Sequence, residues 1–93
     1  MTMYKIKNSF LLKDICGEKV AIARGQFAIE FNGTIVLNET GAFLWEKLES
    51  YCSIEELAES LSKQYMIDEE LALTDTETYI NKMLEYELLE CRE

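Results

Sequence analysis

Side chains that commonly perform catalysis or bind metals are scarce in this chain. It has no His, which removes the commonest general base and the commonest metal ligand. Cys16, Cys52 and Cys91 are far apart and lack CxxC spacing, so we expect reduced thiols of a cytoplasmic protein. The acidic residues match no EF-hand loop, and their spacing marks no pair held in a pocket. We therefore predict no enzymatic activity, no metal and no cofactor.

The charge of the chain is acidic and unevenly distributed. The 93 residues carry a net charge of −9. Residues 1–52 hold six acidic and six basic side chains, whereas residues 53–93 hold twelve acidic and three basic ones. Because such a surface repels phosphate, nucleic acid is not expected as a partner. No apolar segment is long enough for a signal peptide or a membrane span, so a membrane is not expected either.

The first third of the chain has the pattern of antiparallel strands. Strands are predicted over about residues 9–15 and 18–24, because these apolar runs flank a Gly-containing turn. A third, short strand is predicted over residues 34–37, where a β-branched run follows the turn signal Asn32-Gly33.

The rest of the chain has helical periodicity. Helices are predicted over about residues 38–49, 54–65 and 69–87, and their N-caps are Asn38, Ser53 and Asp68. The third helix has two apolar stripes, which together are wider than one contact requires. The core-type stripe contains Ala72, Thr76, Tyr79, Met83 and Tyr86, and the second contains Leu73, Ile80 and Leu84 with Glu77 in line.

These elements predict one α+β domain over residues 1–93. It is winged-helix-like: an N-terminal three-stranded antiparallel β ribbon or sheet precedes a three-helix bundle. A winged helix can bind DNA through its third helix. Between Asp68 and Glu87, however, there are seven acidic residues and one base, Lys82, so this helix is not expected to enter a DNA groove.

The strand over residues 34–37 is expected to end its sheet with one edge unpaired. It contains no charged residue and no Pro, the usual protections of an open edge. If the third helix lies alongside, an extended peptide could add to the strand and bury side chains against Leu73, Ile80 and Leu84. The alternative is that these residues pack inside the domain or in a homodimer, as in a structural or regulatory dimerisation module. The pattern alone favours neither.

The segment Leu37–Leu48 has a more specific resemblance. Its sequence, Leu-Asn-Glu-Thr-Gly-Ala-Phe-Leu-Trp-Glu-Lys-Leu, resembles the Leu-Asn-Glu-x-Gly-x-x-[Ile/Leu]-Trp-x-x-Leu segment of the PqqD family, named for the pyrroloquinoline quinone biosynthesis protein D. Ser53–Leu57, Tyr65–Asp68 and Leu88-Leu89 follow in the order and spacing of that family. The resemblance extends from about Phe10 to Leu89.

This resemblance implies a recognition element for ribosomally synthesised, post-translationally modified peptides (RiPPs). Such a protein is a non-catalytic peptide chaperone of natural product biosynthesis. It binds the leader of a precursor peptide by β-strand addition and presents it to a modifying enzyme, often a radical S-adenosylmethionine (radical SAM) enzyme. The implied peptide-binding residues are Thr34, Ile35, Val36 and Leu37 on the strand and Leu73, Thr76, Glu77, Ile80, Lys82 and Leu84 on the helix.

Two further expectations come from the family pattern. The signature residues Asn38, Gly41 and Trp45 are interpreted as a helix cap, a close helix contact and a core anchor. The family often has a Gly shortly before its final leucines, where this chain has Tyr86-Glu87. The third helix is therefore expected to run on further than in the family.

Overall fold

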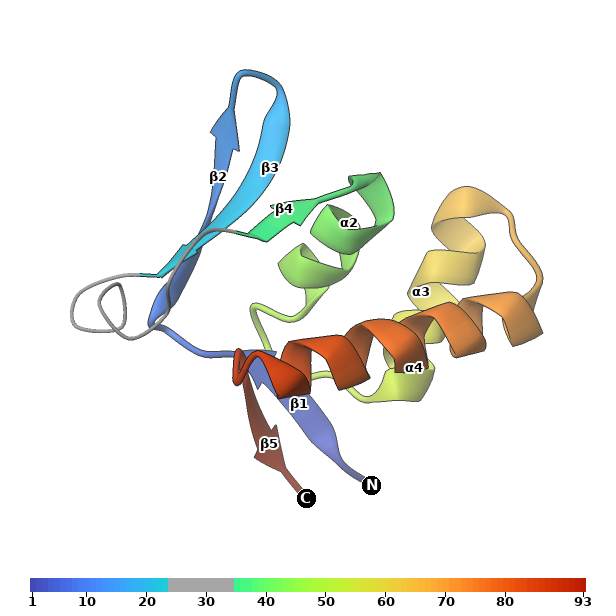
Figure 1. Cartoon of the computed structure of the whole chain (residues 1–93). Helices are drawn as coiled ribbons and strands as arrows, with labels where there is room; N and C mark the ends of the chain where they lie inside the picture. Colours follow the sequence, from blue (N-terminus) through green and yellow to red (C-terminus); the bar gives the residue numbers. More distant parts are fainter. Residues whose placement is uncertain (24–34) are drawn as a thin grey trace.

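The structure contains five strands and three helices in the part of the chain that it describes. It is a computed structural model and describes residues 1–23 and 35–93. The elements in chain order are β1 (Met3–Ile6), β2 (Phe10–Ile15), β3 (Glu18–Ala23), β4 (Ile35–Leu37), α2 (Glu39–Lys47), α3 (Ile54–Tyr65), α4 (Glu69–Glu85) and β5 (Leu89–Arg92) (Figure 1). The predicted α+β class, with strands preceding three helices, is confirmed.

Three of the strands form an antiparallel sheet in the order β2-β3-β4. The β2–β3 hairpin turns at Cys16 and Gly17, whose φ angles are 52° and 85°. Two successive residues with positive φ match the right-handed twist of the strands that they join, so the predicted hairpin forms where its Gly indicated. The expected turn at Asn32-Gly33 and the first residue of the predicted third strand, Thr34, lie outside the described residues.

The second sheet was not predicted. In it β1 pairs antiparallel with β5, so Met3 lies opposite Arg92 and Ile6 opposite Leu89. On its other side β1 exchanges two backbone hydrogen bonds with Cys52: the Tyr4 N–H donates to the Cys52 carbonyl at 2.8 Å, and the Cys52 N–H donates to the Tyr4 carbonyl at 2.9 Å. Residues from both ends and the middle of the sequence therefore meet in one ribbon (Figure 1).

Local hydrogen bonds fix the start of each helix, as predicted. The Asn38 side chain accepts from the Gly41 N–H at 2.8 Å. Ser53 and Glu56 form the expected capping box, in which each side chain accepts from the other residue's backbone N–H. Asp68 accepts from the Glu70 N–H at 3.1 Å. Each such cap typically stabilises its helix by about 1 kcal/mol.

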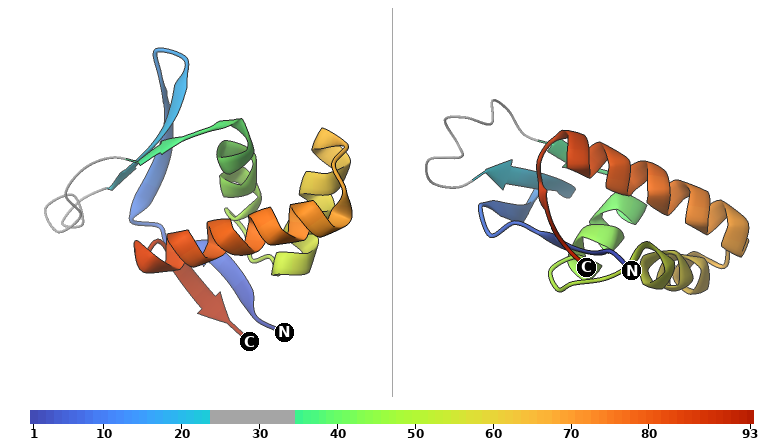
Figure 2. Two further views of the ribbon diagram at one scale, coloured as in Figure 1. Left: turned by 45° about the vertical axis from the view of Figure 1, so that its right-hand side comes forward. Right: turned by 90° about the horizontal axis from the view of Figure 1, so that it is seen from below.

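The core lies where the three helices meet the two sheets. Its largest completely buried apolar side chains come from α3, α4 and the segments that follow α2 and α4: Leu48, Leu57, Leu61, Ile80 and Leu88. Trp45 is only 2% exposed, which agrees with its interpretation as a core anchor. Both views in Figure 2 show α4, the longest helix, lying beside α3.

The end of α4 differs from the prediction. The helix ends at Glu85, two residues earlier than expected, and Glu87 has a φ angle of 59°. The Glu87 N–H donates to the Leu84 carbonyl and the Leu88 N–H to the Met83 carbonyl, both at 3.0 Å. These bonds form a Schellman motif, which requires a left-handed residue at its C′ position. A Glu therefore occupies a conformation that Gly adopts without steric cost.

Replacing Glu87 with Gly should stabilise the protein. The variant Glu87→Gly removes the side chain that makes the left-handed conformation costly, so we expect the free energy of unfolding to rise by about 0.5–1 kcal/mol. Urea denaturation followed by circular dichroism measures this. The matched control is Glu77→Gly, which removes the same charge in the middle of the helix and should lower the stability by about 0.5–1 kcal/mol. Equal effects of the two substitutions would contradict the assignment of Glu87 to the left-handed position that follows α4.

Candidate functional site

The β4 strand has an open edge among the described residues. It pairs with β3 on one side, and no described strand pairs with it on the other. Ile35 and Leu37 face the core, whereas the side chain of Val36 points outward and is 60% exposed. Successive residues of a strand direct their backbone N–H and C=O groups to opposite edges. Pairing with β3 therefore uses only alternate residues of β4, and the other backbone groups point to the open edge.

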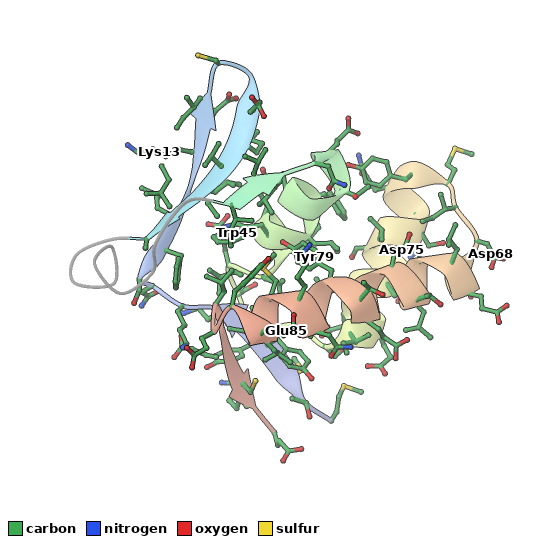
Figure 3. All side chains as sticks on the ribbon, viewed as in Figure 1. Lys13, Trp45, Asp68, Asp75, Tyr79 and Glu85 are labelled. Carbon is green, nitrogen blue, oxygen red and sulfur yellow. The ribbon has the colours of Figure 1, made fainter. Side chains whose placement is uncertain are left out.

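Tyr79 connects α4 to the first turn of α2, just after this strand. Its phenol O–H donates to the Gly41 carbonyl at 2.8 Å, close to the point where β4 passes into α2. A Cβ atom on Gly41 would lie 3.5 Å from the Tyr79 ring, 3.6 Å from Leu37 Cβ and 2.9 Å from the Asn38 carboxamide oxygen. The absence of a side chain at Gly41 thus lets α4, β4 and the cap of α2 approach one another, as the close-contact interpretation predicted. Figure 3 shows Tyr79 extending from α4 toward α2 and β4.

The buried stripe of α4 divides its surface into two flanks. The stripe consists of Ala72, Thr76, Ile80 and Met83. Residues three, four and seven positions apart share one side of a helix, so Asp75, Lys82 and Tyr86 lie on the Tyr79 side. We call Asp75, Tyr79, Lys82 and Tyr86 the groove flank, because Tyr79 bonds to Gly41 in the first turn of α2, which follows β4.

The opposite flank faces α3. Leu73 lines a cavity of about 230 Å³ together with Glu55, Ala58 and Glu59 of α3 and Glu69 of its own helix. Leu73, Glu77 and Leu84 lie on this second flank by the same helical spacing. Leu73 and Leu84 are each 37% exposed.

The structure therefore changes the predicted helix wall. Thr76 and Ile80 are both 0% exposed, so their side chains are part of the core and do not line an open surface, in contrast to the prediction. The reason is that the buried stripe is centred on these two residues. Of the other four predicted residues, only Lys82 lies on the groove flank; Leu73, Glu77 and Leu84 lie on the flank away from Tyr79. On the strand side, Ile35, Val36 and Leu37 form β4, and Thr34 lies outside the described residues.

Sequence reasoning missed Tyr79 and Tyr86 of the groove flank because it placed both tyrosines in the core. Tyr79 is half-buried and Tyr86 is 39% exposed. A Tyr combines an apolar ring with a hydroxyl that needs a hydrogen-bond partner, so it suits the margin of a buried stripe better than the centre. The presence of two Tyr residues in the apolar stripe was therefore the signal that could have placed them at its margin.

Burial raises the pKa of the Tyr79 phenol, which makes the stability of the protein depend on alkaline pH. The folded state holds the proton more tightly than the unfolded state. The stabilisation that comes from the protonated Tyr79 phenol is therefore complete below the ordinary Tyr pKa of about 10. Above pH 10 the free energy of unfolding falls by up to about 1.4 kcal/mol per pH unit. In Tyr79→Phe we expect about 1 kcal/mol less stability at pH 7, from the lost hydrogen bond, and a shallower decline above pH 10.

Chemical denaturation at several pH values between 7 and 11 measures both effects. Tyr86→Phe is the matched control, because it removes a phenol O–H from a more exposed position at the end of the same helix. Parallel pH profiles for wild type and Tyr79→Phe would contradict the role given to the buried phenol.

The described residues contain no group of His, Cys, Asp or Glu side chains that could hold a metal ion.

A larger cavity, of about 500 Å³, lies between β2 and the second half of α2, where its lining includes Leu12, Trp45 and Glu49. None of the nine predicted peptide-binding residues that the structure describes lines it. In the two described stretches of chain, no helix is both long enough and apolar enough to span a membrane.

A small α+β domain with an open β-strand edge beside a long helix belongs to the class of folds that can recognise peptides by strand addition. The family comparison identifies this chain further. The family model described as coenzyme PQQ synthesis protein D (PqqD) matches residues 21–89, and the chain belongs to this family. No curated protein sequence matches the chain.

Solved structures with the same fold are similar over nearly the whole chain. One is titled TbiB1 in complex with the TbiA(beta) leader peptide; it has a TM-score of 0.74 and 22% sequence identity, and the match covers 92% of this chain and 94% of that one. A lasso peptide synthetase B1 complexed with the leader peptide has a TM-score of 0.73, 15% identity and coverages of 94% and 96%.

The third is a PqqD truncation of Methylobacterium extorquens PqqCD, described as a functional, stand-alone RiPP recognition element. It has a TM-score of 0.73 and 13% identity, and the match covers 95% of this chain and 88% of that one. At these identities the likeness establishes the fold.

Proposed function

We propose that this protein is a leader-peptide recognition element that binds an extended peptide as an added strand on β4. The observation that carries the proposal is the open edge of Ile35–Leu37, together with the Tyr79–Gly41 hydrogen bond that holds α4 against α2 just after this strand. Membership of the PqqD family supports it, as do two structures of the same fold that contain leader peptides. The protein itself has no catalytic role in this proposal. It acts as one domain in the cytoplasm and presents the precursor peptide to a separate modifying enzyme, such as a radical SAM enzyme.

The geometry defines how the peptide would lie. Every neighbouring pair in the β2-β3-β4 sheet is antiparallel, so we place the peptide antiparallel to β4 as a fourth strand. Its side chains would then alternate between two surroundings. Those on one side face the groove flank, where Tyr79 and Tyr86 offer aromatic rings. Those on the other side lie beside the exposed Val36.

The charges of the groove flank set a second expectation. Asp75 and Lys82 lie two helical turns apart on this flank, on either side of Tyr79. Lys82 lies in the last turns of the helix and Asp75 in its first half. A peptide that lies alongside α4 could therefore place a basic residue near Asp75 and an acidic residue near Lys82. Such exposed pairs contribute roughly 0.2–1 kcal/mol each, so they select register more than they supply affinity.

A direct test uses synthetic peptides that represent the leader segment of any short precursor peptide found encoded beside the gene. Fluorescence anisotropy with a labelled leader should give saturable binding with a Kd on the order of micromolar, which corresponds to about −8 kcal/mol. A peptide of the same composition in scrambled order is the control and should bind at least tenfold more weakly. Amide hydrogen exchange should show that the N–H groups of residues 35–37 that point to the open edge become protected only when the leader is present, whereas those bonded to β3 are protected in both states. Equal affinity for the scrambled peptide, or edge amides already protected without peptide, would overturn the proposal.

Sedimentation with and without the leader tests the alternative of a dimerisation module that uses the same edge. A dimer that the leader neither dissociates nor enters would favour that alternative. A one-to-one complex of monomer and leader supports the recognition element.

A further inference from the structure

The β5 strand provides a second open edge, separate from that of β4. It pairs with β1 on one side, and no described strand lies on its other side. Figure 1 shows β5 at the margin of the molecule. The side chains of Glu90, Cys91 and Arg92 are all exposed.

The hydrogen bonds of β1 show which backbone groups of β5 point outward. Tyr4 uses both its N–H and its C=O on Cys52, and the Ile6 N–H donates to the Leu48 carbonyl at 2.8 Å. These groups point away from β5. In an antiparallel pair, two opposite residues either exchange hydrogen bonds or both turn their backbone groups away. Cys91, which lies opposite Tyr4, therefore directs its N–H and C=O to the open edge.

The charges on one face of this ribbon alternate. Lys5 lies opposite Glu90, and Arg92 stacks over the Tyr51 ring with its guanidinium carbon 4.1 Å from the ring centre. Alternation along a strand places Glu90 and Arg92 on the same face, with Cys91 between them on the other face. The open edge thus presents one acidic and one basic side chain, placed symmetrically about Cys91.

We propose that β5 pairs antiparallel with β5 of a second copy of this chain, about a two-fold axis at Cys91. The two Cys91 residues would exchange two N–H···O=C bonds, because both direct their backbone groups to the edge. Glu90 of each copy would then lie opposite Arg92 of the other, as a non-hydrogen-bonded pair, in which side chains are closest. The result is a continuous sheet in the order β1-β5-β5-β1.

Charge complementarity identifies a second copy as the occupant and fixes the register. An axis at Glu90 would bring two glutamates together, and an axis at Arg92 would bring two arginines together. Only the axis at Cys91, among these three, gives two opposite-charge pairs, and a two-fold axis creates both at once. The β4 edge belongs to the other sheet, so it is not used in this pairing.

A charge-swap series tests the proposal. Analytical ultracentrifugation of the full chain over a range of concentrations should show a weak dimer whose population rises with concentration. Glu90→Arg and Arg92→Glu each create two like-charge pairs and should weaken dimerisation by about tenfold. The double variant Glu90→Arg/Arg92→Glu restores opposite charges across the axis and should return to within about threefold of wild type. Val36→Lys, on the β4 strand, is the control and should leave dimerisation unchanged.

Crosslinking gives a second readout. In a Cys16→Ser/Cys52→Ser background only Cys91 remains, and bismaleimidoethane should join two chains through it. Circular dichroism confirms that each variant is folded. A chain that stays monomeric at every concentration, or a double variant as weak as the single ones, would overturn the proposal.

Discussion

A protein carrying Ile80→Glu is expected not to fold. Ile80 is 0% exposed and lies in the middle of the buried stripe of α4, so the substitution places a carboxylate among apolar side chains without a partner. The loss of apolar burial costs about 2–5 kcal/mol and an unpaired buried charge about 3–5 kcal/mol, so together they cost about 5–10 kcal/mol. A domain of this size has a total stability of only about 5–10 kcal/mol. Circular dichroism and one-dimensional NMR should show loss of the folded signature at 25 °C.

Leu73→Glu is the matched control, because it places the same charge on the same helix. Leu73 is 37% exposed, so the variant should fold. We expect about 0.5–1.5 kcal/mol of destabilisation from partial loss of apolar burial and from repulsion by Glu55, Glu59 and Glu69, which share its cavity. If both variants folded equally well, the assignment of Ile80 to the core and Leu73 to the surface would be wrong.

Proline substitution along β4 should separate peptide binding from stability. Pro removes a backbone N–H, and it is tolerated in an edge strand only where that N–H faces away from the neighbouring strand. Adjacent residues direct their N–H groups to opposite edges. Therefore one of the two variants, Ile35→Pro or Val36→Pro, should lose an N–H that bonds to β3. We expect that variant to be destabilised by about 2–3 kcal/mol. The other should stay close to wild-type stability and bind the leader at least tenfold more weakly.

The measurement pairs urea denaturation with anisotropy titration of the labelled leader for both variants. The control for loss of side-chain packing is the alanine at the same position, Ile35→Ala or Val36→Ala, which keeps the N–H. Val36→Ala should retain binding within about threefold, because only one exposed side chain is truncated. If both Pro variants bound the leader with wild-type affinity, the peptide would not add to this strand.

Features that depend on neighbouring residues could be predicted from the sequence. The caps at Asn38, Ser53 and Asp68 use side chains that bond within three residues, and the β2–β3 turn needs only the positive φ angles of Cys16 and Gly17. The β1–β5 ribbon could not be predicted in this way. Each strand has four residues, no turn joins them, and their pairing depends on chain ends brought together by the core.

Of the candidate site, the strand edge could be predicted from the sequence, but the side of the helix that accompanies it could not. The open edge of β4 follows from its position as the last strand before the helices. The side of α4 that faces it depends on the rotation of that helix, which its neighbours set. A pattern of apolar residues placed Leu73 and Leu84 toward the peptide and Tyr79 in the core. In the structure, Tyr79 bonds to Gly41 and Leu73 lies over α3, because Thr76 and Ile80 occupy the centre of the buried stripe.

The pairing of Met3 with Arg92 has a consequence for how this domain can be combined with others. Directly opposite residues of an antiparallel pair have Cα atoms about 5 Å apart, so polypeptide fused before Met3 and after Arg92 would enter and leave at one point. A host protein could thus carry the whole unit within a single surface loop, without stretching either junction. The attachment point is on the β1–β5 sheet, while β4 belongs to the other sheet, so such a fusion would leave the proposed peptide-binding edge free and the domain could act as a portable module.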